Sequence, residues 1–238
     1  MEPMERPDDR ALLTLFQAIA AGDLAEVRRR LDASQGLAVA PIRIAASRQD
    51  PDTYFLDVIR HYVYSGDTAL HIAAASYQRP TAGLLVAMHA RVRARNRRGA
   101  EPIHYAADGS PGRENWDPAA QRWIIEYLIA NGADPNACDD SGVAALHRAV
   151  RTRSAAAVGA LLENGADLRL MNKRGSTPLH LAVQNTGRSD SGSTTAKDEQ
   201  RQIIELLLQH GARPTDTDGK GKTVMASAAS EWIRQLLA

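Results

Sequence analysis

Four histidines recur at one position of a repeated string, and a row of imidazoles could bind a metal or relay protons. They are His71, His104, His147 and His180. Equivalent residues of successive packed helices lie about 10 Å apart. A metal ion, by contrast, needs nitrogens at about 2.0–2.1 Å. We therefore expect no metal shared by these histidines.

Other strings with catalytic potential are incomplete. GRSDSGST at 187–194 has Ser193 where a phosphate-binding loop needs lysine, and DTDGKGKT at 216–223 has Asp216 where the first glycine belongs. We identify no Ser–His–Asp set, paired zinc-binding cysteines or HExxH helix. The single cysteine, Cys138, excludes an intrachain disulfide. The sequence therefore predicts a protein without enzymatic activity, metal or cofactor.

A basic cluster could instead contact phosphates, because it places five arginines within eight residues. Its members are Arg91, Arg93, Arg95, Arg97 and Arg98. The formal net charge of the chain is only +1, and no aromatic residue alternates with these arginines to stack on bases. Acidic residues at the equivalent tip or nearby interrupt a continuous positive stripe: Asp108, Glu114, Asp117, Asp139 and Asp140. We favour a mixed-charge protein-recognition surface, and a nucleic-acid-binding module is the alternative.

The elements that position these residues follow from an internal repeat. The strings are GDTALHIAA, GAEPIHYAA, GVAALHRAV, GSTPLHLAV and GKTVMASAA, which begin at Gly66, Gly99, Gly142, Gly175 and Gly221. The spacings between these glycines are 33, 43, 33 and 46 residues. Thr68, Thr177 and Thr223 lie where helix N-caps are expected, and Pro102 and Pro178 lie in the first helical turn.

A second recurring string ends an apolar helical run with a residue suited to the left-handed conformation. This residue is Gly132, Gly165 or Gly211, and a looser copy has His89 instead. The two strings together predict pairs of helices separated by turns.

This pattern resembles the ankyrin-repeat family, whose 33-residue repeat has a TPLHxA string opening the first of two helices. GSTPLHLAV at 175–183 is nearly the family consensus, and the resemblance covers most of the chain. It implies an all-α repeat fold, an α-solenoid in which helix-turn-helix units joined by β-hairpin-like turns are stacked. It also implies that the recurring histidines are structural and form hydrogen bonds between neighbouring turns. The expected function is a non-enzymatic protein–protein interaction scaffold.

We expect one domain over residues 11–238 after a disordered tail of residues 1–10. Caps over 11–35 and 219–238 enclose repeats that begin at residues 66, 99, 142 and 175. An insertion over 41–64 carries Phe55, Leu56, Ile59 and Val63 at helical spacing and predicts a helical finger. Further insertions over 107–121 and 185–200 predict loops, and Asp117 caps the helix after the first. The expected core leucines are Leu70, Leu84, Leu85, Leu128, Leu146, Leu161, Leu162, Leu179, Leu206 and Leu207.

The resemblance places partner binding on the hairpin tips and on the exposed, concave face of the first helices. The matching positions are Tyr64, Ser65, Arg97, Arg98, Asp108, Asp140, Ser141, Arg151, Lys173, Arg174 and Gln184. A Tyr or Phe of the finger could provide an apolar anchor. Alternatively, the rings of the finger pack on the first repeats.

The sequence also indicates the cellular location of the protein. No apolar run reaches the roughly 18–20 residues of a membrane span, and the N-terminus has no apolar segment typical of a secretory signal. We expect a cytoplasmic monomer with a protein partner, and self-assembly is a further possibility.

Overall fold

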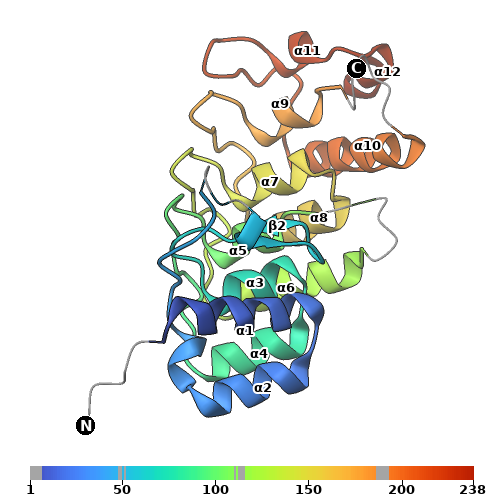
Figure 1. Cartoon of the computed structure of the whole chain (residues 1–238). Helices are drawn as coiled ribbons and strands as arrows, with labels where there is room; N and C mark the ends of the chain where they lie inside the picture. Colours follow the sequence, from blue (N-terminus) through green and yellow to red (C-terminus); the bar gives the residue numbers. More distant parts are fainter. Residues whose placement is uncertain (1–6, 48–49, 51, 110, 112–115, 186–192) are drawn as a thin grey trace. The chain divides into compact units, whose positions relative to one another are not determined.

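The structure is a computed structural model that describes residues 7–47, 50, 52–109, 111, 116–185 and 193–238. Its contacts define two compact units. Unit 1 contains residues 1–106 and 127–134, and unit 2 contains residues 107–126 and 135–238. The single domain expected from the sequence stays a prediction. Figure 1 labels most of the helices and strands of the chain. Among the described residues, no helix combines the length and the apolar character that a membrane span requires.

Unit 1 consists of helix pairs and a short β-hairpin. Its elements are α1 (Asp9–Ala21), α2 (Leu24–Ala33), the 3₁₀ turns η1 (Gln35–Ala38) and η2 (Asp52–Tyr54), β1 (Phe55–Leu56), β2 (His61–Tyr62), α3 (Ala69–Ala75), α4 (Arg79–Ala87) and α5 (Pro102–Ala106). Helix α3 packs against α1, α4 and α5, and α2 packs against α4. The buried faces are aliphatic, with Leu15 and Ile19 of α1 and Leu70 and Ile72 of α3 fully enclosed.

The segment predicted to be the N-terminal cap contains two helices separated at Gly22, as expected, and Gly22 has a φ of 74°. Its start differs from the expectation, because α1 begins at Asp9 and not at residue 11. Asp8 caps the helix by accepting a hydrogen bond from the backbone N–H of Arg10. The expected tail of residues 1–10 is therefore helical at its end, and residues 1–6 lie outside the described residues.

The predicted helical finger over 41–64 is wrong, because its described residues contain a 3₁₀ turn over 52–54 and a β-hairpin over 55–62 but no α-helix. Phe55 pairs with Tyr62 and Leu56 with His61, and Arg60, at a φ of 51°, lies in the turn between the strands. Aromatic and β-branched side chains favour strands, and a short apolar run does not distinguish the two conformations. Backbone hydrogen bonds continue beyond the strands, because Val63 donates its N–H to the carbonyl of Tyr54 at 2.8 Å and its carbonyl accepts from the N–H of Ala46 at 3.1 Å.

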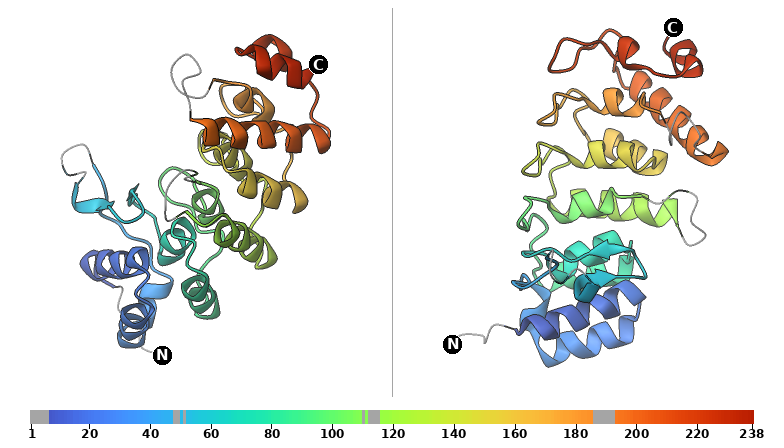
Figure 2. Two further views of the ribbon diagram at one scale, coloured as in Figure 1. Left: turned by 90° about the vertical axis from the view of Figure 1, so that its right-hand side faces the viewer. Right: turned by 45° about the horizontal axis from the view of Figure 1, so that its top comes forward.

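Unit 2 contains the remaining helices. They are α6 (Pro118–Ala130), whose residues from 127 onward belong to unit 1, α7 (Ala145–Arg151), α8 (Ala155–Glu163), α9 (Pro178–Ala182), α10 (Thr194–Gln209), α11 (Val224–Ser227) and α12 (Glu231–Leu237). The first helices of consecutive repeats are packed together, α7 on α9 and α9 on α11, and the second helices α8 and α10 are packed together. The turns of this unit lie on one side of its helices (Figure 2). These contacts are those of helix-turn-helix repeats.

The predicted helix ends are largely confirmed. Thr177 accepts from the N–H of His180 at 3.4 Å, and Thr223 accepts from that of Ala226 at 3.1 Å. The residues that follow the second helices are left-handed, with φ values of 97° at Gly132, 85° at Gly165, 98° at Gly211 and 66° at His89. The repeated strings thus mark helix boundaries as expected from their local conformational preferences.

The prediction for the helix that follows the 107–121 insertion is confirmed, whereas the loop predicted over 185–200 is only partly correct. Asp117 accepts from the backbone N–H groups of Ala119 and Ala120, each at 2.9 Å, and α6 begins at Pro118 as predicted. The loop predicted over 185–200 is too long, because α10 begins at Thr194. The polar residues of its first turns continue the spacing of the buried Gln200, Ile203 and Ile204, so the amphipathic helix extends back toward the loop. Residues 110, 112–115 and 186–192 of these insertions, including Glu114, lie outside the described residues.

Eight of the ten expected core leucines are buried, whereas Leu84 and Leu206 are only half-buried. Their neighbours Leu85 and Leu207 are both 0% exposed. Adjacent residues of an α-helix point in directions about 100° apart, so both members of a Leu–Leu pair cannot face the centre of the core equally.

Candidate functional site

The turns before four of the five repeat glycines, all except Gly66, are organised by an Asn or Asp three positions before the glycine. In each case one side-chain oxygen accepts the backbone N–H groups two and four residues later, at 2.8–3.2 Å. The four residues are Asn96, Asp139, Asn172 and Asp218. These residues were not predicted from the sequence, although their constant spacing of three residues before the glycine was a signal that could have identified them. They pre-form the turns that carry several of the predicted binding residues.

Successive turns are also joined by backbone hydrogen bonds. The N–H of Arg97 donates to the carbonyl of Ser65 at 2.8 Å in unit 1, and that of Lys173 donates to Ser141 at 3.0 Å in unit 2. The structure therefore brings these two pairs of predicted residues together. In the last turn the N–H of Gly219 donates at 2.9 Å to the carbonyl of Gly175, the repeat glycine itself, and not to that of the residue before it.

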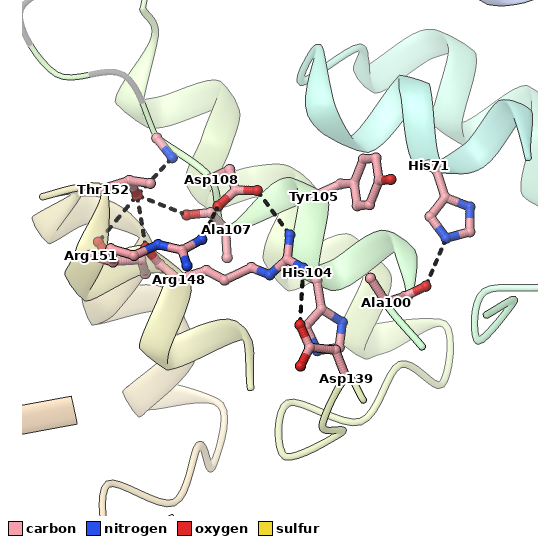
Figure 3. A network of polar contacts seen from close by, with 12 residues as sticks. His71, Ala100, His104, Tyr105, Ala107, Asp108, Asp139, Arg148, Arg151 and Thr152 are labelled. Carbon is pink, nitrogen blue, oxygen red and sulfur yellow. Dashed lines mark hydrogen bonds and ion pairs between the residues drawn. The ribbon is translucent and has the colours of Figure 1, made fainter. Parts of the chain in front are cut away.

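The recurring histidines occupy the structural role that the resemblance implies. In unit 1, the Nε2 atom of His71 lies 3.1 Å from the carbonyl of Ala100, as shown in Figure 3. In unit 2, Nε2 of His147 lies 3.2 Å from the carbonyl of Ser176, and its Nδ1 accepts from the N–H of Ala144 at 3.2 Å. Burial lowers the pKa of His147, which favours the neutral ring that can accept at one nitrogen and donate at the other.

His180 forms the corresponding bond to the carbonyl of Lys222 at 3.1 Å, and Nδ1 of His104 accepts from the N–H of Glu101 at 3.0 Å. Across the described residues, no group of three or more His, Cys, Asp or Glu side chains is arranged to hold a metal ion.

Tyr64, Arg97 and Arg98 come together in unit 1. The guanidinium carbon of Arg98 lies 4.4 Å from the centre of the Tyr64 ring, and that of Arg97 lies 5.5 Å from it. Arg97 also donates from Nη2 to the carbonyl of Ala46 at 3.0 Å. Both arginines are exposed, and in the described part of the chain neither is paired with a carboxylate.

Another arginine of the basic cluster has its charge compensated. Arg93 lies 3.7 Å from Oε2 of Glu101 and 3.5 Å from Oδ2 of Asp134. Glu101 is 2% exposed and occupies the position of the N-cap threonines in other repeats. Its burial raises its pKa, opposed by the charges of Arg93 and Arg95. The basic cluster is therefore not a continuous row of free cations.

The hairpin of unit 1 has an inner and an outer face. On the inner face the ring of His61 lies 4.5 Å from that of Tyr105, next to the buried Leu56. On the outer face the rings of Phe55 and Tyr62 are tilted against each other with their centres 4.7 Å apart, and Tyr62 is 39% exposed. The hairpin thus packs on its repeat through one face and presents an aromatic pair on the other.

In unit 2, the half-buried Arg148 bridges two carboxylates (Figure 3). Its Nη1 donates to Asp108 at 3.0 Å and its Nη2 to Asp139 at 3.2 Å. Burial acts to raise the pKa of Asp139, but the N–H groups of the turn and Arg148 lower it below its ordinary value. Asp108, predicted to bind a partner, is half-buried with its charge compensated, since Arg151 also lies 3.9 Å away. The network holds the start of the 107–121 insertion against α7.

The other predicted residues of unit 2 lie at the surface. Their side chains belong to turns and helix ends: Asp140, Ser141, Arg151, Lys173, Arg174 and Gln184. The carbonyl of Gln184 accepts from the buried Gln200 at 2.7 Å, so its backbone is fixed while its side chain remains exposed.

Comparison with known proteins agrees with this architecture. A family model described as ankyrin repeats in three copies matches residues 119–192, and a model of one ankyrin repeat matches residues 174–219. No curated protein matches the chain. The matched residues include the turns, capped helices and buried histidines of unit 2. Residues 119–219 of the chain therefore consist of ankyrin repeats.

Proposed function

We propose that this chain is a non-enzymatic scaffold that binds a protein partner through its turn tips and the exposed face of its first helices. Ankyrin repeats are generally protein–protein interaction modules. The proposal includes the expected α-solenoid, whose concave helix face would adjoin the tips. The partner-contacting residues are those predicted from the sequence, except that Asp108 contributes by fixing its segment through Arg148.

The observation that carries the proposal is the pre-formed state of the exposed tips. In unit 2, Asn172 holds the turn by accepting from the N–H groups of Arg174 and Ser176, while Lys173 and Arg174 are exposed. A surface whose backbone is fixed before binding loses little conformational entropy on association.

Unit 1 adds exposed apolar area of the kind found at interfaces. Ile44 is 64% exposed, Val58 58% and Tyr62 39%, all within the 41–64 insertion. Large apolar side chains at the surface are typical of binding patches when they gather in one segment. The insertion therefore supports binding by unit 1 as well as by the turns.

The alternative, nucleic-acid binding through the basic cluster, has less support. Arg93 is paired with two carboxylates, and the Tyr64 ring is already in contact with guanidinium groups, so it is not an open stacking platform.

The test is affinity capture with the full chain followed by mass spectrometry. Two tip variants, Arg97→Glu/Arg98→Glu and Lys173→Glu/Arg174→Glu, are compared with wild type and with Arg28→Glu, an exposed control on α2. We expect one protein to be retained by wild type and control and lost from at least one tip variant. Retention by both tip variants alike would refute binding through these tips.

A further inference from the structure

We propose that Tyr64, Arg97 and Arg98 form a carboxylate-binding clamp that takes an acidic segment of a partner polypeptide. This inference rests on the proposed scaffold function and specifies the chemistry of its partner. The name arginine clamp is used below for these three residues.

The backbone of the arginine clamp is fixed at each residue. Tyr64 donates its N–H to Asp67 at 2.7 Å. Arg97 donates its N–H to the carbonyl of Ser65 at 2.8 Å, and Arg98 donates its N–H to Oδ1 of Asn96 at 2.9 Å. A ligand therefore meets three side chains whose Cα positions are already set, which reduces the entropy lost on binding.

The side chains are arranged so that the guanidinium groups are held in place but keep N–H donors for a ligand. A guanidinium packed near an aromatic face is restrained by cation–π attraction, while its N–H edge can still point to a ligand. Arg97 uses Nη2 for the carbonyl of Ala46, which restrains it further. Planar N–H edges match carboxylates in a bidentate geometry that a lysine cannot provide.

The charge around the arginine clamp favours an anionic ligand. The nearby Asp67 is 0% exposed, and its carboxylate accepts from Asn96 at 2.8 Å and from Tyr105 at 2.8 and 2.9 Å. Glu101 is buried beside Arg93. Over the described residues, the local carboxylates are thus occupied by other groups, and the charges of Arg97 and Arg98 remain uncompensated.

The same features favour a polypeptide over a nucleic acid. Affinity for a nucleic acid grows with the number of phosphates neutralised and with bases stacked on open rings. The arginine clamp offers two guanidinium groups, and its only ring is next to both of them. One or two Asp or Glu side chains satisfy this arrangement.

The test uses fluorescence anisotropy of the full chain with three labelled probes: a short peptide of alternating glutamate and glycine, its glutamine counterpart and a thymidine oligonucleotide. At low salt we expect the glutamate peptide to bind best. Arg97→Gln/Arg98→Gln should weaken its binding about tenfold or more, because charge-assisted hydrogen bonds to the carboxylates are lost. Arg98→Lys should weaken it less, and the control Arg28→Gln should leave it unchanged. Circular dichroism verifies that each variant is folded.

Equal binding of the glutamate and glutamine peptides, no binding of either, or tighter binding of the oligonucleotide would each overturn the arginine clamp. The scaffold is tested separately by capture. If Lys173→Glu/Arg174→Glu loses the captured partner while Arg97→Gln/Arg98→Gln retains it, the clamp is wrong and the scaffold stands.

Discussion

Two glycines of unit 2 have nearly the same backbone conformation but different surroundings, so alanine should affect them unequally. Gly165 has a φ of 85° and Gly175 a φ of 80°. A Cβ at Gly165 would meet no atom within 4 Å, whereas one at Gly175 would lie 2.7 Å from the backbone N and Cα of Gly219. Gly165→Ala should therefore cost only the left-handed strain of about 1–2 kcal/mol.

Gly175→Ala should cost the same strain and two further contributions. The close approach involves backbone atoms, so the turn must move, at about 1–3 kcal/mol for overpacking. The movement also disturbs the hydrogen bond from Gly219 to the carbonyl of Gly175, at 2.9 Å, which contributes about 1 kcal/mol. The total of about 3–6 kcal/mol exceeds the cost at Gly165 by about 2–4 kcal/mol.

Urea unfolding monitored by tryptophan fluorescence measures this difference in stability in unit 2, which contains both glycines. All three tryptophans, Trp116, Trp123 and Trp232, belong to unit 2. With a denaturant slope of about 2 kcal/mol/M, the two variants should differ in midpoint by about 1–2 M. Equal midpoints would show that the turns do not approach each other as the structure places them.

Three other substitutions, the last with a matched control, test the core and the buried charges. Glu101→Gln should stabilise the protein at about pH 7, and this gain in stability should shrink as the pH falls toward about 4.5. The reason is that burial raises the pKa of Glu101 in the folded state, which disfavours folding only where the carboxylate is charged. A difference in stability that does not change with pH, measured by urea unfolding with circular dichroism, would contradict this. Leu179→Ala, at a side chain that is 1% exposed, should cost about 2–5 kcal/mol in thermal or urea unfolding, and an unchanged stability would refute the assigned core. Arg148→Met should lower the stability by about 3 kcal/mol, because it leaves two half-buried carboxylates without their cation. Arg151→Met, at an exposed side chain, should lower it by less than about 1 kcal/mol. Similar losses of stability for both variants would contradict the bridging role of Arg148.

The regular parts of the fold were predictable because they depend on local chemistry. A threonine or aspartate that accepts an N–H group, a proline in a first turn and a glycine after an apolar run define helix ends over a few residues. Thr177, Asp117, Pro118 and Gly132 accordingly lie where the sequence placed them. The hairpin was missed because Phe55 and its apolar neighbours satisfy both helical and strand patterns over a short run.

By itself the sequence determined the repeat, most of its helix boundaries and the positions of the turns, since these follow from neighbouring residues in the chain. Only the tertiary structure decided which charges are compensated and which glycines are needed for close packing. Arg93 and Arg98 belong to the same basic run, yet one is paired with carboxylates and the other lies near Tyr64. Gly165 and Gly175 share a conformation, yet only one faces another backbone. These differences depend on groups distant in the chain, because charge compensation and steric contact act through space.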